Sequence, residues 1–442
     1  MSENKFMSCS SYNIYNLITL LIAHLSFFRF LRMKTLLTSR KKITTSLILV
    51  SSFLLLLFQY LHIDGWMSKK HFATKPLTSQ SSRHYTDVCK QIVDGNSSVI
   101  KKANSSMSHF VKQPISPWKY IDLTKNCNYF AKNRGYILKA LSKNEEDFPI
   151  AFSINIYKDV EQFERLLRAI YRPQNFYCIH VDKKSPSIFR RAVKKISSCF
   201  SNVFVASEII KVVWGESSIL QSQLICMKDL WKRSNTWKYL INLTGQEFPL
   251  KTNNELVDIL QKLKGKSIVK GRYASKQRLR GRYLYVHRGI MRTNELKQPF
   301  PGNFTFYKGS TYVVLSKAFV NFILHDKLAR DFLEWVNNTG KPEETFYQTL
   351  YFNVDFDKYF RNNTFNGPNT RYVNWSGHRA PCHGKFVRHV CVHGIGDLKT
   401  ITQQKALFVN KFYLHYQYLA LDCIEQWLHK RTLDYYGSLS LQ

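Results

Sequence analysis

The chain has 442 residues, which is enough for one large domain or two with a sizeable core. Its formal charge is +35, from 65 Lys and Arg residues against 30 Asp and Glu residues. Such a charge suits a nucleic-acid binder, but the basic residues are spread along the chain and no nucleic-acid-binding motif occurs. We therefore expect no nucleic acid among the partners, and an anionic substrate or an anionic membrane surface instead.

Residues 43–61 form an apolar stretch of 19 residues without a charge, which is long enough to span a bilayer. Basic residues cluster before it and only Lys69 and Lys70 closely follow it, so the positive-inside rule puts the N-terminus in the cytosol. No small-residue cleavage site follows, which favours an uncleaved signal-anchor over a signal peptide, with a buried core helix as the alternative. A second span at residues 17–28 is left open.

Four regions follow from this reading: a cytoplasmic tail at 1–42, the transmembrane signal-anchor at 43–61, a lumenal stem at 62–120 and a folded lumenal domain at 121–442. The stem is polar, rich in Ser and Lys and weakly patterned, as a spacer is. Met33 opens a short basic tail of the usual kind, so a working protein without residues 1–32 is an open alternative.

Cysteines and glycosylation motifs agree with an oxidising lumen. Cys9 precedes the anchor and the other eight cysteines follow it, an even number that indicates four disulfides. Metal ligation is the alternative, but no C-x-x-C pair occurs. N-glycosylation sequons begin at Asn96, Asn104, Asn303, Asn337, Asn362 and Asn374. A further sequon begins at Asn242, in an apolar segment that we expect to be buried.

Residues 148–185 organise the folded domain. Two short apolar runs, 149–156 and 176–181, flank a segment whose apolar residues recur at helical spacing. This strand–helix–strand pattern predicts a parallel α/β sheet, in which ligands bind at the carboxyl ends of the strands. No Gly-rich phosphate loop follows the first strand, so dinucleotide and P-loop sites are disfavoured. An ordinary α/β core with no site in this unit is the alternative.

The same pattern continues along the chain. We expect helices at 188–198, 217–234, 253–263 and 317–325, strands at 203–206, 239–243 and 312–315, a helical turn at 332–336, and a partly helical tail at 407–433. Thr252 is placed to cap the helix at 253–263. The stretch 264–282 carries eight basic residues; it is either a solvated loop or a contact for an acidic group on a substrate or lipid.

Three runs, 166–185, 198–230 and 237–256, closely resemble the core 2 β1,6-N-acetylglucosaminyltransferases of glycosyltransferase family 14. The likeness extends over residues 127–423. It implies a GT-A-type fold, with a Rossmann-like, mainly parallel sheet flanked by helices, behind a single type II Golgi membrane anchor. It also implies inverting transfer of a sugar from a UDP-sugar to the 6-hydroxyl of a mucin-type O-glycan, which is core 2 branching. GlcNAc is the first expectation for the sugar. UDP-GlcNAc or a related UDP-sugar and an O-glycoprotein are thus the expected partners, and a homodimer is left open.

Inverting transfer needs a carboxylate that takes the proton from the acceptor hydroxyl as it attacks the anomeric carbon. The segment Gly-Lys-Pro-Glu-Glu-Thr-Phe at 340–346 resembles the family's Pro-Asp-Glu motif. Glu344 matches the catalytic base, and Glu343 matches the preceding acid on the acceptor side. A pair of carboxylates capping a helix after Pro342 is the alternative.

The leaving diphosphate carries charge that must be neutralised. The family does this without a metal, and Arg388 and Lys411 match its two cations; each alone would equally suit a surface position. Asp355-Phe356-Asp357 has the Asp-x-Asp sequence typical of a metal site but matches no motif of the family. The resemblance therefore implies no metal and no cofactor.

The remaining site residues are implied by the same resemblance. The nucleotide side comprises Asn155, Ile156, Tyr157, Asp182, Lys183, Lys184 and Trp214. The acceptor side adds Arg278 and Trp375; core packing is the alternative for Trp375. The implied disulfides are Cys89–Cys423, Cys127–Cys199, Cys178–Cys226 and Cys382–Cys391.

Departures from the family pattern fall mainly on the acceptor side. Gly377 replaces a tyrosine of the family and Thr244 replaces a cysteine. A carboxylate that family members carry near Lys270 is missing. The acceptor and the donor sugar are therefore open. An I-branching enzyme, a xylosyltransferase and a catalytically silent sugar-binding homologue are the alternatives.

Overall fold

The structure is a computed structural model that describes residues 86–109, 113–274, 283–286, 290–302, 304–354, 368–377 and 380–439. The expected anchor at 43–61, Cys9 and Met33 lie outside these residues. In the part of the chain that is described, no helix combines the length and the apolar character needed to cross a bilayer.

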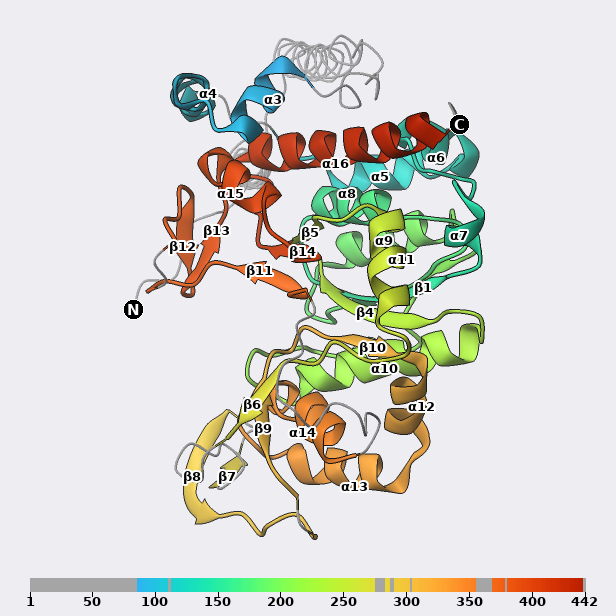
Figure 1. The fold of residues 1–442 in the computed structure, drawn as a ribbon, viewed down its shortest axis with the longest axis vertical. Coiled ribbons are helices and arrows are strands. Elements are labelled where there is room, and N and C mark those ends of the chain that lie inside the picture. Colours follow the sequence, from blue (N-terminus) through green and yellow to red (C-terminus); the bar gives the residue numbers. More distant parts are fainter. Residues whose placement is uncertain are drawn as a thin grey trace, which may run out of the picture. The chain divides into compact units, whose positions relative to one another are not determined.

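A five-stranded sheet lies at the centre of the described domain, with the strand order β10-β4-β1-β2-β3 (Figure 1). Its strands are β1 (Ile150–Ile156), β2 (Phe176–Val181), β3 (Val203–Val205), β4 (Tyr239–Thr244) and β10 (Val314–Ser316). The first four run parallel and β10 pairs antiparallel with β4. The fold is thus mixed α/β with a mainly parallel sheet, as the strand–helix–strand pattern predicts.

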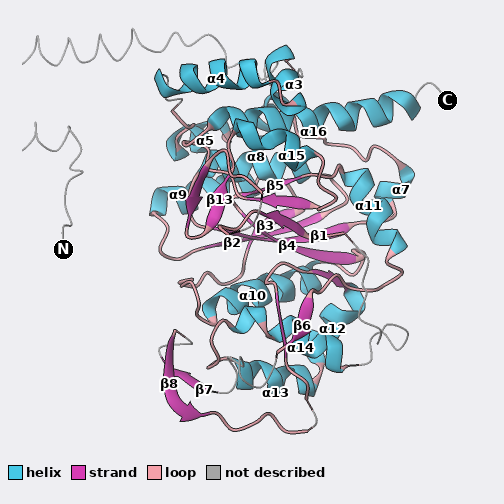
Figure 2. Ribbon diagram, turned by 60° about the vertical axis from the view of Figure 1, so that its left-hand side comes forward, coloured by secondary structure: helices cyan, strands magenta, loops and turns pink. Residues whose placement is uncertain are grey.

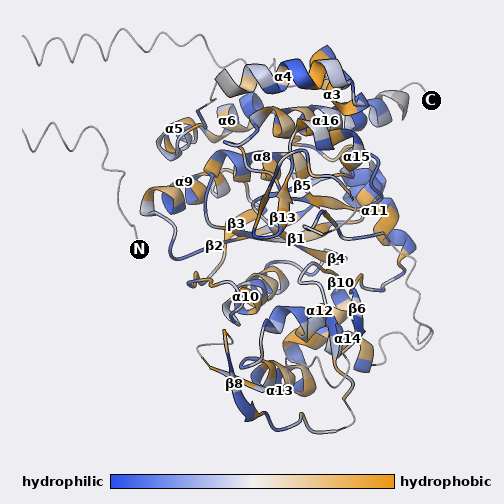
Figure 3. Cartoon of the chain, turned by 90° about the vertical axis from the view of Figure 1, so that its left-hand side faces the viewer, coloured by the Kyte–Doolittle hydropathy of each residue, from blue (hydrophilic) through white to orange (hydrophobic). Residues whose placement is uncertain are grey.

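Residues along each strand alternate between two helical layers, because successive side chains of a strand point to opposite faces. Phe152 and Ile154 pack in one core cluster with residues of α8 (Val160–Ile170), α9 (Ser187–Ser197) and α11 (Asn253–Lys262). Ala151 packs in the other, with residues of α10 (Ser218–Arg233), α12 (Lys317–His325), α13 (Lys327–Val336) and α14 (Phe346–Asn353). Figure 2 shows the sheet between these layers, and Figure 3 shows hydrophobic residues along its strands.

A smaller unit stands beside the main sheet. It contains the sheet β11-β14-β5, built from Arg371–Val373, Phe408–Asn410 and Glu247–Pro249, and the pair β12–β13, built from Lys385–Val387 and Val390–Val392. The short elements η4 (Ile395–Asp397) and α15 (Leu398–Thr402) lead to the long helix α16 (Tyr418–Leu439). Because β14 pairs with β5, the C-terminal part of the chain is joined to the segment that follows β4.

Regular structure begins inside the region expected to be a stem. Helices α3 (Asp87–Asp94) and α4 (Ser97–His109) precede α5 (Pro117–Leu123), α6 (Cys127–Arg134) and α7 (Lys143–Glu146). Helix α3 packs on α15 and α16 in a hydrophobic cluster of its own. The last part of the predicted stem, from Asp87 onward, is therefore folded against the domain.

Element bounds match the predictions closely where a local signal exists. Thr252 and Glu255 form a capping box at the start of α11, which confirms Thr252 as the cap. Helix α13 is longer than the predicted turn at 332–336, because the Asp326 side chain caps it by accepting a hydrogen bond from the Leu328 N–H at 2.8 Å. The two-stranded pairs β6–β9 (Gly271–Tyr273 with Tyr307–Gly309) and β7–β8 (Tyr283–Val286 with Met291–Leu296) were not predicted.

The four disulfides of the structure are the four pairs that the family resemblance implies: Cys89–Cys423, Cys127–Cys199, Cys178–Cys226 and Cys382–Cys391. Asn242 is buried, as expected for its strand. The prediction of a glycan at Asn374 is not supported, because that side chain is 2% exposed and donates to the Pro381 carbonyl at 3.0 Å. Asn303 and Asn362 lie outside the described residues.

Candidate active site

The carboxyl ends of β1 and β2 carry three of the expected nucleotide contacts. The Asn155 amide faces α10, where it donates to the Ser222 hydroxyl at 2.7 Å, and its carbonyl oxygen Oδ1 is buried with no hydrogen-bond partner among the described residues. Ile156 is buried in the core, so only its backbone faces the strand end. Tyr157 follows with its ring half exposed. The strand end thus offers a buried acceptor and an aromatic face beside each other.

The turn after β2 connects the sheet to the loop that carries Trp214. Asp182 accepts a hydrogen bond from the Lys184 N–H at 2.8 Å and lies 3.3 Å from the Lys184 ammonium group. The Lys183 N–H donates to the Ile210 carbonyl at 3.0 Å, which fixes the start of the loop. Trp214 itself is 68% exposed. Its indole is therefore open to solvent next to the Asp182 turn.

Three cations, Lys158, Arg388 and Lys411, lie near Tyr157 and Tyr413. The Lys411 ammonium donates to the Val387 carbonyl at 3.2 Å, one residue before Arg388. Burial lowers the pKa of Lys411, and the neighbouring charges of Arg388 and Lys158 lower it further. The Lys158 and Lys411 ammonium groups lie 4.1 and 5.3 Å from the centre of the same ring, that of Tyr413. This concentration of positive charge suits a diphosphate, whose oxygens accept charge-assisted hydrogen bonds.

Lys158 was missed by the sequence analysis. Its position directly after Tyr157, at the carboxyl end of β1, is the signal that would have pointed to it. Arg388 is held in the loop that Cys382–Cys391 closes. Those two cysteines and Asp397 are close enough to suggest a metal site, but both sulfurs are in the disulfide and neither is available as a thiolate ligand.

Glu344 ends the short helix η3 (Pro342–Glu344), directly before α14. Its carboxylate lies between two ammonium groups, with Lys308 3.9 Å from one oxygen and Lys341 3.9 Å from the other. The Lys341 ammonium also lies 4.5 Å from the centre of the Trp214 ring. The expected base therefore stands next to the loop of the expected nucleotide contacts. Sequence analysis identified neither lysine.

Glu343 is placed differently from Glu344. It is only 5% exposed, and its charge adds to the burial that raises the pKa of the Tyr347 hydroxyl. The Tyr347 hydroxyl donates to the Gln223 side chain at 2.9 Å on α10. Glu343 therefore lies in the interior, whereas the Glu344 side chain is 26% exposed.

Tyr312 connects Glu344 with the cations. Its hydroxyl accepts a hydrogen bond at 3.2 Å from the amide of Asn410, the residue before Lys411. Burial raises the pKa of Tyr312, and the charges of Glu247 and Glu344 raise it further. Glu247 is fully buried in an ion pair with Arg371 at 2.8 Å. The expected base and the expected phosphate-binding cations therefore lie near the same tyrosine, beside this buried ion pair.

Trp375 lies beside the cation loop. It is 45% exposed and forms an isolated β-bridge with Val390, two residues after Arg388. Gly377 follows in a turn with a φ of +91°, which a glycine adopts without strain. Arg278, Asp355 and Asp357 lie outside the described residues, so their expected roles stay predictions.

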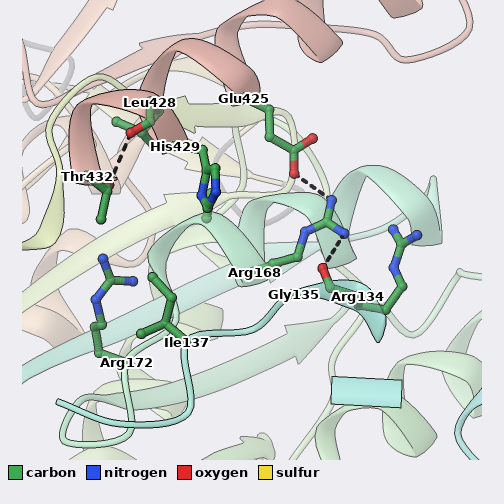
Figure 4. Close-up of a pocket in the computed structure, with 10 residues that line it drawn as sticks. Arg134, Gly135, Ile137, Arg168, Arg172, Glu425, Leu428, His429 and Thr432 are labelled. Atoms are coloured by element: carbon green, nitrogen blue, oxygen red, sulfur yellow. Dashed lines mark hydrogen bonds and ion pairs between the residues drawn. The ribbon is translucent and has the colours of Figure 1, made fainter. Parts of the chain in front are cut away.

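Two hollows of the described residues are alternatives to this site. One of about 340 Å³ is lined by Ile210, Lys211, Ser217, Ser218, Gln221 and Asn337, on both sides of the Trp214 loop. The other, of about 60 Å³, lies among α6, α8 and α16 (Figure 4). Its guanidinium groups are engaged within the protein, since Arg168 pairs with Glu425 and Arg134 with Glu164. The candidate active site is therefore the region around Glu344, Trp214 and the cations.

Sequence comparison places the chain among known proteins. A sequence model of the Core-2/I-Branching enzyme family matches residues 150–402. A mouse N-acetyllactosaminide β-1,6-N-acetylglucosaminyl-transferase is 39% identical over 358 residues, which cover 78% of this chain and 86% of the relative. The chain belongs to the Core-2/I-branching enzyme family.

Two human members of the family show the same degree of likeness. The human N-acetyllactosaminide β-1,6-N-acetylglucosaminyl-transferase is 40% identical over 319 residues, covering 70% of this chain and 79% of its own. A human β-1,3-galactosyl-O-glycosyl-glycoprotein β-1,6-N-acetylglucosaminyltransferase 3 is 36% identical over 373 residues, which cover 79% of this chain and 84% of the relative. The span matched to the Core-2/I-branching family contains Asn155, Glu344 and Arg388, and Lys411 lies just beyond it.

Proposed function

We propose that the protein is an inverting glycosyltransferase with a GT-A-type fold, which moves GlcNAc from UDP-GlcNAc to the 6-hydroxyl of an O-glycan. The observation that carries the proposal is the arrangement of Glu344 and the Arg388–Lys411 pair in one site, linked through Tyr312 and Asn410. Relatives that bear the name β-1,6-N-acetylglucosaminyltransferase support the choice of sugar and linkage.

In the proposed reaction, Glu344 accepts the proton of the acceptor hydroxyl while its oxygen attacks the anomeric carbon. The bond from that carbon to the diphosphate oxygen breaks, and the electron pair leaves with UDP. Attack on the face opposite the leaving group inverts the anomeric configuration. Arg388 and Lys411 neutralise the charge that develops on the diphosphate, which stabilises the transition state.

No metal is required in this scheme. The grouping of three cationic side chains, Arg388, Lys411 and Lys158, near Tyr413 supports a diphosphate site formed by the chain itself. A single divalent ion supplies a comparable charge in other glycosyltransferases, so the cation group serves the same electrostatic purpose. Asn155, Tyr157 and Asp182 lie at the carboxyl ends of β1 and β2, which supports a nucleotide site there.

N-acetyllactosamine is a second candidate acceptor, because of the identities of the relatives. The two N-acetyllactosaminide enzymes are 39% and 40% identical to this chain, against 36% for the human O-glycan enzyme. An I-branching reaction on N-acetyllactosamine chains uses the same donor and base. It differs only in the saccharide that occupies the acceptor side.

The expected compartment is the Golgi lumen, with residues 43–61 as a type II membrane anchor. Four disulfides within residues 89–423 fit an oxidising lumen rather than the cytosol. Exposed sequon residues such as Asn96 and Asn337 fit glycosylation there.

The deciding experiment is a donor and acceptor screen of the full chain in detergent. UDP-GlcNAc, UDP-GalNAc and UDP-xylose are each offered with core 1 disaccharide and with N-acetyllactosamine, and products are analysed for linkage by NMR. We expect a β1,6-linked GlcNAc product that is lost in Glu344→Gln. Transfer of another sugar, another linkage, or no transfer to any acceptor refutes the proposal.

A further inference from the structure

A second group of cations lies beside Glu344, on the strand pair β6–β9. The two strands run antiparallel, with Arg272 paired directly opposite Lys308. The Lys308 ammonium is one of the two that flank the Glu344 carboxylate, at 3.9 Å. Arg272 thus neighbours a residue that contacts the expected base.

The packing of α14 determines which way these two side chains point. A Cβ atom added at Gly271 would lie 2.7 Å from the Phe352 ring, and one added at Gly309 would lie 2.6 Å from the Gln348 side chain. Phe352 and Gln348 both belong to α14, which therefore covers this face of the pair. Since side chains alternate along a strand, Arg272 and Lys308 extend from the opposite face.

Two like charges directly opposite each other on one face destabilise a strand pair. Lys308 is balanced by Glu344, but Arg272 is exposed and forms no ion pair with a carboxylate in the described residues. Lys270, two residues earlier, adds a further cation, and partial burial lowers its pKa. Lys308 and Lys341 flank Glu344, Arg272 lies directly opposite Lys308, and the acid next to Glu344 in the chain, Glu343, is buried.

We propose that the face of β6–β9 next to Glu344 binds an anionic group, a carboxylate or a sulfate, of the acceptor saccharide. This inference rests on the proposed transferase function, because it needs the acceptor hydroxyl to meet Glu344. A substituent on the sugar next to the reacting one then comes within reach of Arg272. A guanidinium group matches both oxyanions with paired hydrogen bonds, and the anion relieves the repulsion between Arg272 and Lys308.

The test uses three matched acceptors with the full chain and UDP-GlcNAc at low ionic strength. One carries a sialic acid carboxylate on the galactose, the second carries its uncharged methyl ester, and the third carries a 3-O-sulfate in place of the sialic acid. We expect kcat/KM for the carboxylate to exceed that for the ester by about tenfold or more, as for a charge-assisted hydrogen bond. The advantage should shrink as salt is added. The sulfate shows whether the site distinguishes the two oxyanions.

Variants separate a local contact from the overall charge of the protein. Arg272→Gln should bring the ratio between carboxylate and ester close to one, and Arg272→Lys should keep part of it. Arg191→Gln removes the same charge from the exposed side of α9 and should leave the ratio unchanged. UDP affinity, measured by calorimetry, reports whether each variant is folded.

Two results overturn the inference while the transferase function stands: equal turnover of carboxylate and ester by the wild type, or a preference that Arg272→Gln retains. Absence of transfer to every acceptor, charged and neutral, refutes the proposed function and this inference with it.

Discussion

The ammonium nitrogen of Lys341 lies 3.9 Å from a carboxylate oxygen of Glu344. The same nitrogen lies 4.5 Å from the centre of the exposed Trp214 ring. One side chain therefore contacts both the expected base and an expected nucleotide contact. A lysine in this position holds the carboxylate close to the Trp214 loop.

Lys341→Met should lower kcat about tenfold, because it keeps the length of the side chain and removes the charge that orients Glu344. Lys341→Arg should restore most of the loss. Steady-state kinetics with saturating donor measure both variants. An unchanged kcat in Lys341→Met would show that Glu344 needs no support from this residue.

Glu344→Gln should lower kcat by about two to four powers of ten and leave UDP binding nearly intact, because the amide accepts no proton from the hydroxyl. Arg388→Ala and Lys411→Ala should weaken both UDP affinity and kcat, since these charges meet the diphosphate before and during bond cleavage. Calorimetric titration with UDP separates the two classes. Full activity of Glu344→Gln would move the base elsewhere.

Treatment with EDTA should leave the activity of the wild type largely unchanged, because the cations of the site belong to the chain. Asp355→Ala and Asp357→Ala should also retain activity if this Asp-x-Asp spelling is accidental. Rate measurements with and without manganese check the expectation. Strict dependence on manganese, together with loss of activity in either folded aspartate variant, would contradict it.

UDP affinity should decline as the pH rises toward 10. The pKa of Lys411 is lowered from 10.5, so the side chain loses its charge at a lower pH than an ordinary lysine. The diphosphate remains fully ionised in this range, because the second pKa of a phosphate group is about 6. Lys411→Arg keeps its charge throughout. Dissociation constants at several pH values should therefore diverge between the two proteins; parallel profiles would exclude Lys411 as the titrating group.

Removing Cys89–Cys423 and removing Cys382–Cys391 should affect different properties, the first the stability of the fold and the second the binding of UDP. The first spans 334 residues, so Cys89→Ala with Cys423→Ala should lower the free energy of unfolding by about 2–5 kcal/mol and spare UDP affinity. The second spans 9 residues and closes the Arg388 loop, so its removal should mainly weaken UDP binding. Denaturant unfolding and UDP titration check the contrast, and non-reducing peptide mapping checks the pairing. Equal losses of stability and of UDP affinity in the two double variants would contradict this prediction.

Parts of the fold follow from local patterns. The strands β1 and β2 and the helix α8 were predicted because buried parallel strands and amphipathic helices have distinct periodicities. Thr252 was predicted as a cap because a threonine directly before a helical segment is a helix-start signal. Helix α13 was predicted too short, because the start signal at Asp326 was overlooked. The close approach of α14 to Gly271 and Gly309 was not predicted, because it becomes visible only once β6 and β9 are paired.

The contacts that build the site depend on distant segments. Lys308 meets Glu344 through the pairing of β6 with β9, and no periodicity predicts that pairing. Tyr312 and Asn410 are 98 residues apart in the chain. The resemblance to a known family named Glu344, Arg388 and Lys411, but it did not supply the two lysines around the base or Lys158. Such neighbours become visible only when the strands are in place.

The bond between Cys89 and Cys423 turns nearly the whole domain into a covalent ring. A protease that nicks the backbone between α4 and α5, or in any loop inside the ring, leaves both pieces in one molecule until a reductant is added. For a chain held in a membrane by residues 43–61, only a cut ahead of Cys89 sheds the domain. Material released into the medium should then begin between residues 62 and 89, with the ring closed.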